Sequence, residues 1–272
     1  MATTLEGAAD IVKASDSYSS FLQIGLQYRY KAQYIEAFQE VQSRGSIGTI
    51  KTISMSEYRP PFLDKVEQWN KFNKNTGGTL VEKCCHYFDL MSLAADAKPK
   101  KVYASGGQGV NFLDFEQDGE TADIDDHAFV VIDYDNGIRG NFTLNMFCHD
   151  FTEEMVICGD RGRLVTREIF NIHQQKPSSA TVALELGELG GSKHTEVTYA
   201  REIESSGHHG ATYYEHIAFV DQLEGNLSAS ATPLQGLWSI IIACAAQQSI
   251  ATGEAIDIDL FLADNKLSEF SK

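Results

Sequence analysis

Residues 127–148, HAFVVIDYDNGIRGNFTLNMFC, contain the clearest indication of the fold. Apolar and polar residues alternate around its central DYDNGIRG segment, and Asn-Gly is a dipeptide that tight β-hairpins favour. We therefore predict two antiparallel strands, near 127–134 and 138–148. A second pair is predicted directly afterwards, near 153–158 and 162–170, joined by the tight turn CGDRGR.

Further strands and helices are predicted on both sides of these hairpins. Strands are grouped along the chain and so are helices, without the regular βαβ alternation of a doubly wound domain. The sequence therefore predicts an α+β fold, in which one large, mostly antiparallel open sheet carries helices on one face. The remaining strands are expected near 21–30, 47–59, 101–106, 181–187, 194–200 and 256–260, and the helices near 3–14, 31–44, 79–95, 211–224 and 233–252.

One of these helices, 211–224, has an apolar stripe. Tyr213, Ile217 and Val220 follow one another at helical spacing. Such a stripe is typical of a helix that packs against a core. The sequence therefore predicts that these three side chains are buried.

Composition and charge exclude several classes of function. The 272 residues are 43% hydrophobic and 22% charged, which is usual for a globular protein. A formal net charge of -16 would repel nucleic acid and anionic membranes, so neither is an expected partner. Five cysteines without a CxxC pair indicate reduced thiols in a cytoplasmic protein. The longest apolar stretch, near LWSIIIACAA, is shorter than a membrane span requires, and no signal peptide is recognisable.

The segment GGTLVEKCCHYFDL, residues 77–90, combines an apolar helix with a polar stripe. On a helix of 100° per residue, Glu82, His86 and Asp89 fall within about 60° of one another. The other positions are mostly apolar, so the helix is predicted to be buried. Because buried carboxylates and imidazoles need partners, the stripe is expected to line a cavity or to belong to a polar network.

Two interpretations of this stripe stay open on spacing alone. An imidazole can accept a proton from a substrate hydroxyl near neutral pH, with a nearby carboxylate orienting the ring or binding a second hydroxyl. Alternatively, the stripe is a satisfied internal network that fixes helix packing. A metal site at Glu82 and His86 is less favoured, because no third ligand with suitable spacing is evident, and we predict none.

The stretch GGTLVEKCCHYFDLM (77–91) resembles the GG-x-x-x-[DE]-x-x-x-H-x-x-D helix of the Gfo/Idh/MocA oxidoreductases, a family that includes inositol and glucose–fructose enzymes. Other segments agree in order, from IGLQYRY (24–30) through DDHAFVVIDYDNGIRGNF (125–142) to LWSIIIACAAQQSIATGEAIDI (237–258). The resemblance covers most of residues 2–262. It implies an open sheet docked on a Rossmann domain, and oxidation of a sugar or cyclitol hydroxyl with NAD or NADP.

The resemblance also implies roles for individual residues. His86 would be the acid/base group or a substrate ligand, and Glu82, where many members have aspartate, would bind substrate hydroxyls; these two are the expected catalytic pair. Lys83 is expected on the cofactor side, or in a salt bridge. Arg29 could contact cofactor or substrate, or form an ion pair. The further residues expected to bind substrate are Asp89, Trp69 and Tyr28, with structural packing the alternative for Trp69.

The front of the chain departs from the family pattern. No G-x-G-x-x-G occurs, since GGQG at 106–109 lacks the third glycine. The E-K-P motif that precedes a helix like ATTLEGAADIVKA in the family is also absent, because Met1 stands directly before that helix. The expected domains are therefore a remnant of a Rossmann domain (a helix plus a strand) over 1–30, and a substrate-binding and oligomerisation domain over 31–272.

Three hypotheses follow for function. The first is a truncated NAD(P)-dependent oxidoreductase-like protein that acts on a sugar or cyclitol, and is inactive unless a partner chain or upstream segment supplies the cofactor domain. The second is a non-catalytic sugar-binding or oligomerisation module. The third is a truncated gene product with a partly unstable N-terminal edge. The resemblance also implies homo-oligomers that associate through the sheet.

Overall fold

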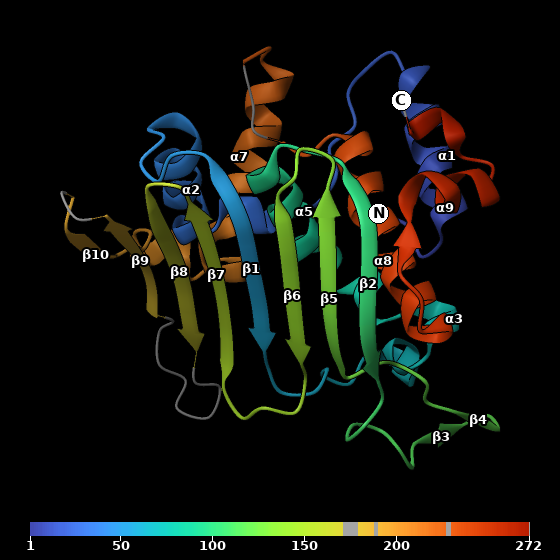
Figure 1. Cartoon of the computed structure of the whole chain (residues 1–272). Coiled ribbons are helices and arrows are strands. Elements are labelled where there is room, and N and C mark those ends of the chain that lie inside the picture. The colour runs from blue at the N-terminus through green and yellow to red at the C-terminus, as the bar shows by residue number, and fades with distance from the viewer. Residues whose placement is uncertain (171–178, 188–189, 227–229, 272) are drawn as a thin grey trace.

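The computed structural model describes residues 1–170, 179–187, 190–226 and 230–271. Within these residues, one nine-stranded sheet has the order β10-β9-β8-β7-β1-β6-β5-β2-β11 (Figure 1). A separate hairpin of β3 (Glu116–Gln117) and β4 (Glu120–Thr121) extends beyond the sheet. The strands of the sheet are β1 (Ile50–Tyr58), β2 (Pro99–Gly107), β5 (His127–Tyr134), β6 (Arg139–Asn145), β7 (Phe151–Gly159), β8 (Gly162–Phe170), β9 (Ser179–Leu186), β10 (Ser192–Glu196) and β11 (Ile256–Asp257).

The pairing of these strands confirms the predicted sheet. All neighbours in it are antiparallel except β1 and β6, which run parallel, so the sheet is mixed. β5 and β6 form the predicted hairpin, with Gly137 at φ 90° in the turn, a conformation that favours glycine. β7 and β8 form the second predicted hairpin.

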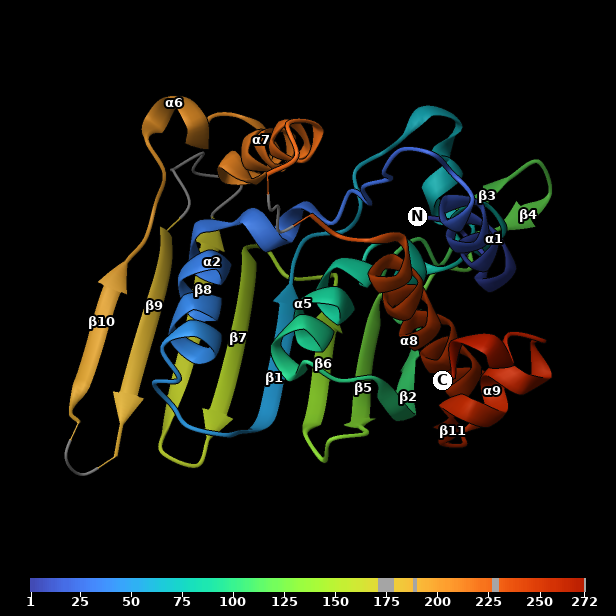
Figure 2. The ribbon, with the colours of Figure 1, turned by 90° about the horizontal axis from the view of Figure 1, so that it is seen from above.

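The helices lie along one face of the sheet (Figure 2). Side chains that point to this face form the core, and on β5 they are Ala128, Val130, Ile132 and Tyr134. Burial of each large apolar side chain stabilises the fold by roughly 1.5–3 kcal/mol. The helices are α1 (Leu5–Asp16), α2 (Ala32–Phe38), α3 (Asn73–Thr76), α4 (Thr79–Glu82), α5 (Cys85–Ala95), α6 (Arg201–Glu204), α7 (Ala211–Leu223), α8 (Pro233–Thr252) and α9 (Ile258–Asp264).

Helix α8 has the bounds that the sequence predicted. Thr232 and Gln235 form a reciprocal capping box, Pro233 occupies the first turn, and Gly253 ends the helix at φ 75°. Its length and mean hydropathy of 1.2 would also suit a membrane span. Here, however, α8 packs on β2, α5 and α1, as the core helix of a globular fold does.

Three predicted elements differ in the structure. The expected strand at 21–30 forms only one bridge, Ile24 with Ala231, and then a 3₁₀ helix, Gln27–Tyr30. The expected helix 31–44 continues from α2 as a π-helix, Gln39–Ser43. The expected strand at 256–260 stops at Asp257, whose side chain accepts a hydrogen bond from the Leu260 N–H and so begins α9 instead.

The prediction that the stripe on α7 is buried is wrong. Tyr213, Ile217 and Val220 are 43%, 40% and 46% exposed. The reason is the position of α7: it packs on Gln27–Tyr30 and Gly207–Gly210 rather than flat against the sheet. Its buried residues are Ala211 and Ala218, so small side chains make its contact with the fold.

Candidate active site

Two glycines fix the start of the motif segment. Gly77 and Gly78 have φ of 78° and 94°, in the region that favours glycine. A Cβ on Gly77 would lie 2.2 Å from the Thr3 carbonyl oxygen, and one on Gly78 would lie 1.7 Å from Gln247 Nε2. The pair therefore lets this segment approach the start of α1 and the side of α8 closely.

The motif segment is two helices and not one. α4 ends at Glu82 and α5 begins at Cys85, with Lys83 and Cys84 between them. The Cys84 N–H reaches back to the Thr79 carbonyl at 3.3 Å, five residues earlier, instead of bonding four residues back. The prediction of a continuous helix over 79–95 is therefore wrong at these two positions. Glu82 and His86 consequently lie on different helices.

His86 stands at the start of α5, half-buried, and its ring stacks on Tyr28. The ring centroids are 4.7 Å apart and the planes differ by 25°. Its Nδ1 atom is buried and has no hydrogen-bond partner among the described residues. Burial, and then the positive charge of Lys83, lower the pKa of His86 well below its ordinary value of 6.5. The ring is therefore uncharged at neutral pH and can accept a hydrogen bond or a proton.

Glu82 is half-buried at the end of α4. Burial raises the pKa of its carboxyl, while Lys83, Arg59 and Lys65 oppose the rise. In the part of the chain that the structure describes, no hydrogen bond or ion pair engages this carboxylate, and none joins it to His86. Its oxygens are thus available to a ligand hydroxyl.

Lys83 lies between these two residues in the chain and contacts neither of them through a hydrogen bond. Its Nζ donates to the Tyr28 hydroxyl at 2.5 Å and lies 3.3 Å from Glu57 Oε1. The Glu57 carboxylate is fully buried on β1, and Arg59 Nη1 is 3.6 Å from it. Lys83 therefore takes part in a salt bridge, one of the two interactions that the sequence suggested for it.

Asp89 and Arg29 pair with each other. Arg29 donates from Nε and Nη2 to the two Asp89 oxygens at 2.6 and 2.5 Å, and from Nη1 to Gln235 Oε1 at 3.0 Å. Both partners are almost completely buried. Burial raises the pKa of Asp89, and the hydrogen bonds from Arg29 oppose the rise. This bidentate pair ties the segment before α2 to α5, which is the ion-pair alternative for Arg29.

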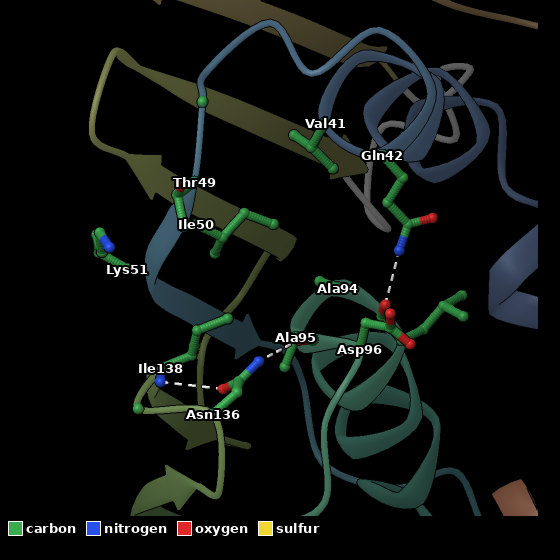
Figure 3. A pocket seen from close by; sticks show the side chains of 13 residues that line it. Val41, Gln42, Thr49, Ile50, Lys51, Ala94, Ala95, Asp96, Asn136 and Ile138 are labelled. Carbon is green, nitrogen blue, oxygen red and sulfur yellow. Dashed lines mark hydrogen bonds between the residues drawn. The ribbon is translucent and has the colours of Figure 1, made fainter.

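Trp69 lies apart from this group. Its side chain is 39% exposed and lines a surface hollow of about 360 Å³, together with Lys74 and residues of the β3–β4 hairpin. The largest hollow described, about 710 Å³, is also elsewhere, at the C-terminal end of α5 (Figure 3). There Gln42 and Asn136 donate to the Leu93 and Ala95 carbonyls. Ten residues of helix place that end roughly 15 Å from His86.

The described residues do not fit the dinucleotide part of NAD or NADP. A dinucleotide cradle needs parallel strands joined by helices, with a glycine-rich turn that opens a helix after a strand. The one parallel pair in the described ranges, β1 and β6, is not joined by a βαβ unit, and Ile24 makes only an isolated bridge. We therefore derive no chemical step that passes through the cofactor.

Sequence reasoning missed Glu57 and a second buried cluster. Lys31 Nζ lies 2.6 Å from Glu153 Oε1 and 2.8 Å from Glu168 Oε2. The alternation along β1 did indicate Glu57, because Ile53, Met55 and Glu57 follow one another at every second position and face inward. A charged residue at a core position of a strand must have a partner.

Comparison with known proteins places this geometry in a family. Residues 43–258 match the model of the oxidoreductase family, C-terminal alpha/beta domain, of the Gfo/Idh/MocA group. The uncharacterized oxidoreductase YrbE of Bacillus subtilis (strain 168) is 22% identical over 260 residues, which are 94% of this chain and 68% of YrbE. The YteT protein of the same organism is 25% identical over 108 residues, 39% of this chain and 25% of its own length.

Solved structures share the fold at low identity. Levoglucosan dehydrogenase in complex with NADH has a TM-score of 0.74 and 18% identity, over 94% of this chain and 71% of that protein. The aldose-aldose oxidoreductase of Caulobacter crescentus, complexed with glycerol, has a TM-score of 0.69 and 15% identity, over 94% and 70%. Because the family model spans well over half of the residues, this chain belongs to the Gfo/Idh/MocA oxidoreductase family.

Proposed function

We propose that this chain binds a sugar or cyclitol beside α4 and α5, and that His86 and Glu82 handle its hydroxyl groups in an NAD(P)-dependent oxidation. The observation that carries the proposal is a pair of half-buried, unpaired groups: an imidazole held uncharged and a carboxylate without a protein partner. A neutral imidazole nitrogen accepts the proton of a hydroxyl, and a carboxylate accepts a hydrogen bond from a second one.

The other expected site residues have more limited roles in this proposal. The Arg29–Asp89 pair holds α5 in place next to the site, and Arg29 keeps unused N–H groups for a cofactor or substrate. Tyr28 and Lys83 adjoin His86, so they can contact substrate or cofactor. Trp69 stays a predicted substrate-binding residue, which would require movement of its loop toward α5.

Oxidation also requires a dinucleotide-binding segment, which the described residues do not form. We propose that residues 1–30 belong to such a domain, that 31–272 form the substrate-binding domain, and that the 272 residues alone transfer no hydride. We also propose a cytoplasmic location, since an NAD(P)-linked enzyme with free thiols suits a reducing compartment. Titration with NADH, followed by nicotinamide fluorescence, tests whether the 272 residues hold the cofactor: saturable micromolar binding would contradict the proposal that they transfer no hydride alone.

A binding titration tests the site itself. We expect myo-inositol or a hexose to bind the unmodified chain, and His86→Asn and Glu82→Gln each to weaken binding by about 1–3 kcal/mol, the usual loss of a buried hydrogen bond. Calorimetry measures the affinity, and thermal unfolding checks that the fold is intact. His194→Asn and Glu254→Gln, which are exposed and lie elsewhere, are the matched controls. Equal affinity in all variants, or unfolding of both site variants, would favour a purely structural network.

The open face of the sheet supports the second candidate function, an oligomerisation module. Phe129 is 61% exposed, and Tyr103 and Val131, which are opposite each other on β2 and β5, are each 44% exposed. Exposed apolar side chains on neighbouring strands are typical of an interaction surface. We propose homo-oligomers through this face, and light scattering should show that Phe129→Glu dissociates them. An unchanged mass for Phe129→Glu would exclude this face.

A further inference from the structure

Tyr28 occupies the centre of the candidate active site although its side chain is almost fully buried. One face of its ring stacks on His86 at 4.7 Å, and its hydroxyl accepts the hydrogen bond from Lys83 Nζ at 2.5 Å. The edge of Tyr87 packs against it at 5.4 Å, and Lys31 Nζ lies 4.3 Å from its ring centroid. Four neighbouring side chains thus restrict the movement of this ring.

Lys83 has a second contact, an ion pair with Glu57. Glu57, on the central strand β1, is 0% exposed and is 3.3 Å from Lys83 Nζ. A cation with a hydrogen bond to a phenol and an ion pair to a buried carboxylate has a fixed position. A continuous series of contacts therefore runs from the sheet through Glu57, Lys83 and Tyr28 to the imidazole of His86.

We propose that Tyr28 and Lys83 are positioning residues for His86: Lys83 fixes the Tyr28 ring through its hydroxyl, and Tyr28 sets the plane of the imidazole by stacking. This inference rests on the proposed function, and it gives Tyr28 and Lys83 a different task from direct contact with substrate or cofactor. The result is an oriented, uncharged ring that can receive a hydroxyl proton.

The charges around His86 agree with this role. After burial, Lys83 is the strongest influence on the pKa of His86, followed by His208, the amino-terminal group and Lys31, and all of these lower it. The acids near Lys83 are Glu82 on α4, whose pKa the Lys83 charge lowers, and Glu57 on β1, which is paired with Lys83. Removal of the Lys83 charge should therefore raise the pKa of His86.

Nuclear magnetic resonance of the histidine side chains tests the proposal without any need for activity. His86→Asn assigns the His86 signals, and a pH titration gives the pKa of the ring. In Lys83→Met we expect this pKa to rise, because a positive charge that disfavours the charged imidazole is removed. Lys83→Arg should keep it low, and Lys51→Met, on an exposed part of β1, is the control that should leave it unchanged.

A paired variant covers the risk that Lys83→Met unfolds because Glu57 loses its partner. Lys83→Met combined with Glu57→Gln removes both charges and should show the same rise. Tyr28→Phe keeps the stacking but loses the hydrogen bond from Lys83, so it should broaden the ring signals. Tyr28→Leu loses both contacts, so it should shift and broaden them more and weaken polyol binding by roughly two- to tenfold.

The outcomes separate this inference from the proposed function. An unchanged pKa of His86 in the Lys83→Met, Glu57→Gln variant, together with unchanged ring signals in Tyr28→Leu, would overturn the positioning role. If those signals change as expected but no polyol binds to any form of the chain, the positioning role stands for the ring and the proposed substrate fails.

Discussion

Lys31 and Lys83 are two buried lysines that the same fold treats differently. Lys31, 4% exposed, lies between Glu153 and Glu168, and the amide of Gln33 and the hydroxyl of Tyr34 donate to the same carboxylates. Lys83, 13% exposed, has one carboxylate at a longer distance and one phenol.

The difference indicates which region is structural and which can act on a ligand. Around Lys31, every carboxylate oxygen except Glu168 Oε1 accepts a hydrogen bond, and His209 Nε2 lies 3.3 Å from that one. The cluster joins α2 to β7 and β8. Around Lys83, both Glu57 oxygens and His86 Nδ1 have no hydrogen-bond partner among the described residues, and His86 and Glu82 are partly exposed. A buried charge surrounded by satisfied partners fixes a fold, whereas one beside unsatisfied groups belongs to a site.

The largest effect on stability is expected at the cluster of Lys31, Glu153 and Glu168. Lys31→Met leaves the buried Glu153 carboxylate without a cation and leaves Glu168 only His209, at 3.3 Å. Loss of one partner of a buried ion pair costs about 3–5 kcal/mol. Urea denaturation should show this loss of unfolding free energy, while Lys51→Met should stay within about 0.5 kcal/mol of the unmodified chain. A loss below about 1 kcal/mol in Lys31→Met would mean that the cluster does not stabilise the fold.

A smaller effect on stability is expected at Lys83. Lys83→Met leaves Glu57 with Arg59 at 3.6 Å, so part of the charge stays compensated. We expect a loss of about 1–3 kcal/mol, the usual cost of one buried group without its partner. The double variant Lys83→Met, Glu57→Gln should recover part of this lost unfolding free energy in the same denaturation assay. A loss as large as that of Lys31→Met would show that the two lysines are equivalent after all.

The sequence predicted the sheet well because alternation along a strand reports directly which face is covered. It predicted the chemistry of the site less completely. A helical projection of 77–90 grouped Asp89 with Glu82 and His86, but the break at Lys83–Cys84 and the partner Arg29, sixty residues earlier, depend on tertiary packing. The stripe on α7 was misassigned for the same reason: periodicity shows that a helix has an apolar face and does not show what covers it.

The smallest expected effect is a pH dependence of stability that comes from the carboxylates around Lys31 and that distinguishes Lys31 from Lys83. Two carboxylates share Lys31, and burial, with Glu168 nearby, raises the pKa of Glu153 to about 7. The Lys31 and His209 charges overcome burial at Glu168 and lower its pKa to about 2. The stability from Glu153 is complete below its ordinary pKa of 4.5 and is lost as pH rises toward 7; that from Glu168 is present above 4.5 and is lost as pH falls toward 2.

Glu153→Gln isolates the first of these contributions, because glutamine cannot ionise. Its carbonyl oxygen can still accept from Lys31, Gln33 and Tyr34, and only the hydrogen bond that Tyr87 donates to the other oxygen is lost. Relative to the unmodified chain, this variant should gain stability between about pH 5 and 7, on the order of 1 kcal/mol per pH unit for one proton. Urea denaturation across that range measures the gain. Glu154→Gln, one residue further along β7 and only partly buried, should keep the pH dependence of the unmodified chain. Parallel curves for Glu153→Gln and the unmodified chain would place the shared proton elsewhere, and Lys31 would then differ from Lys83 in packing alone.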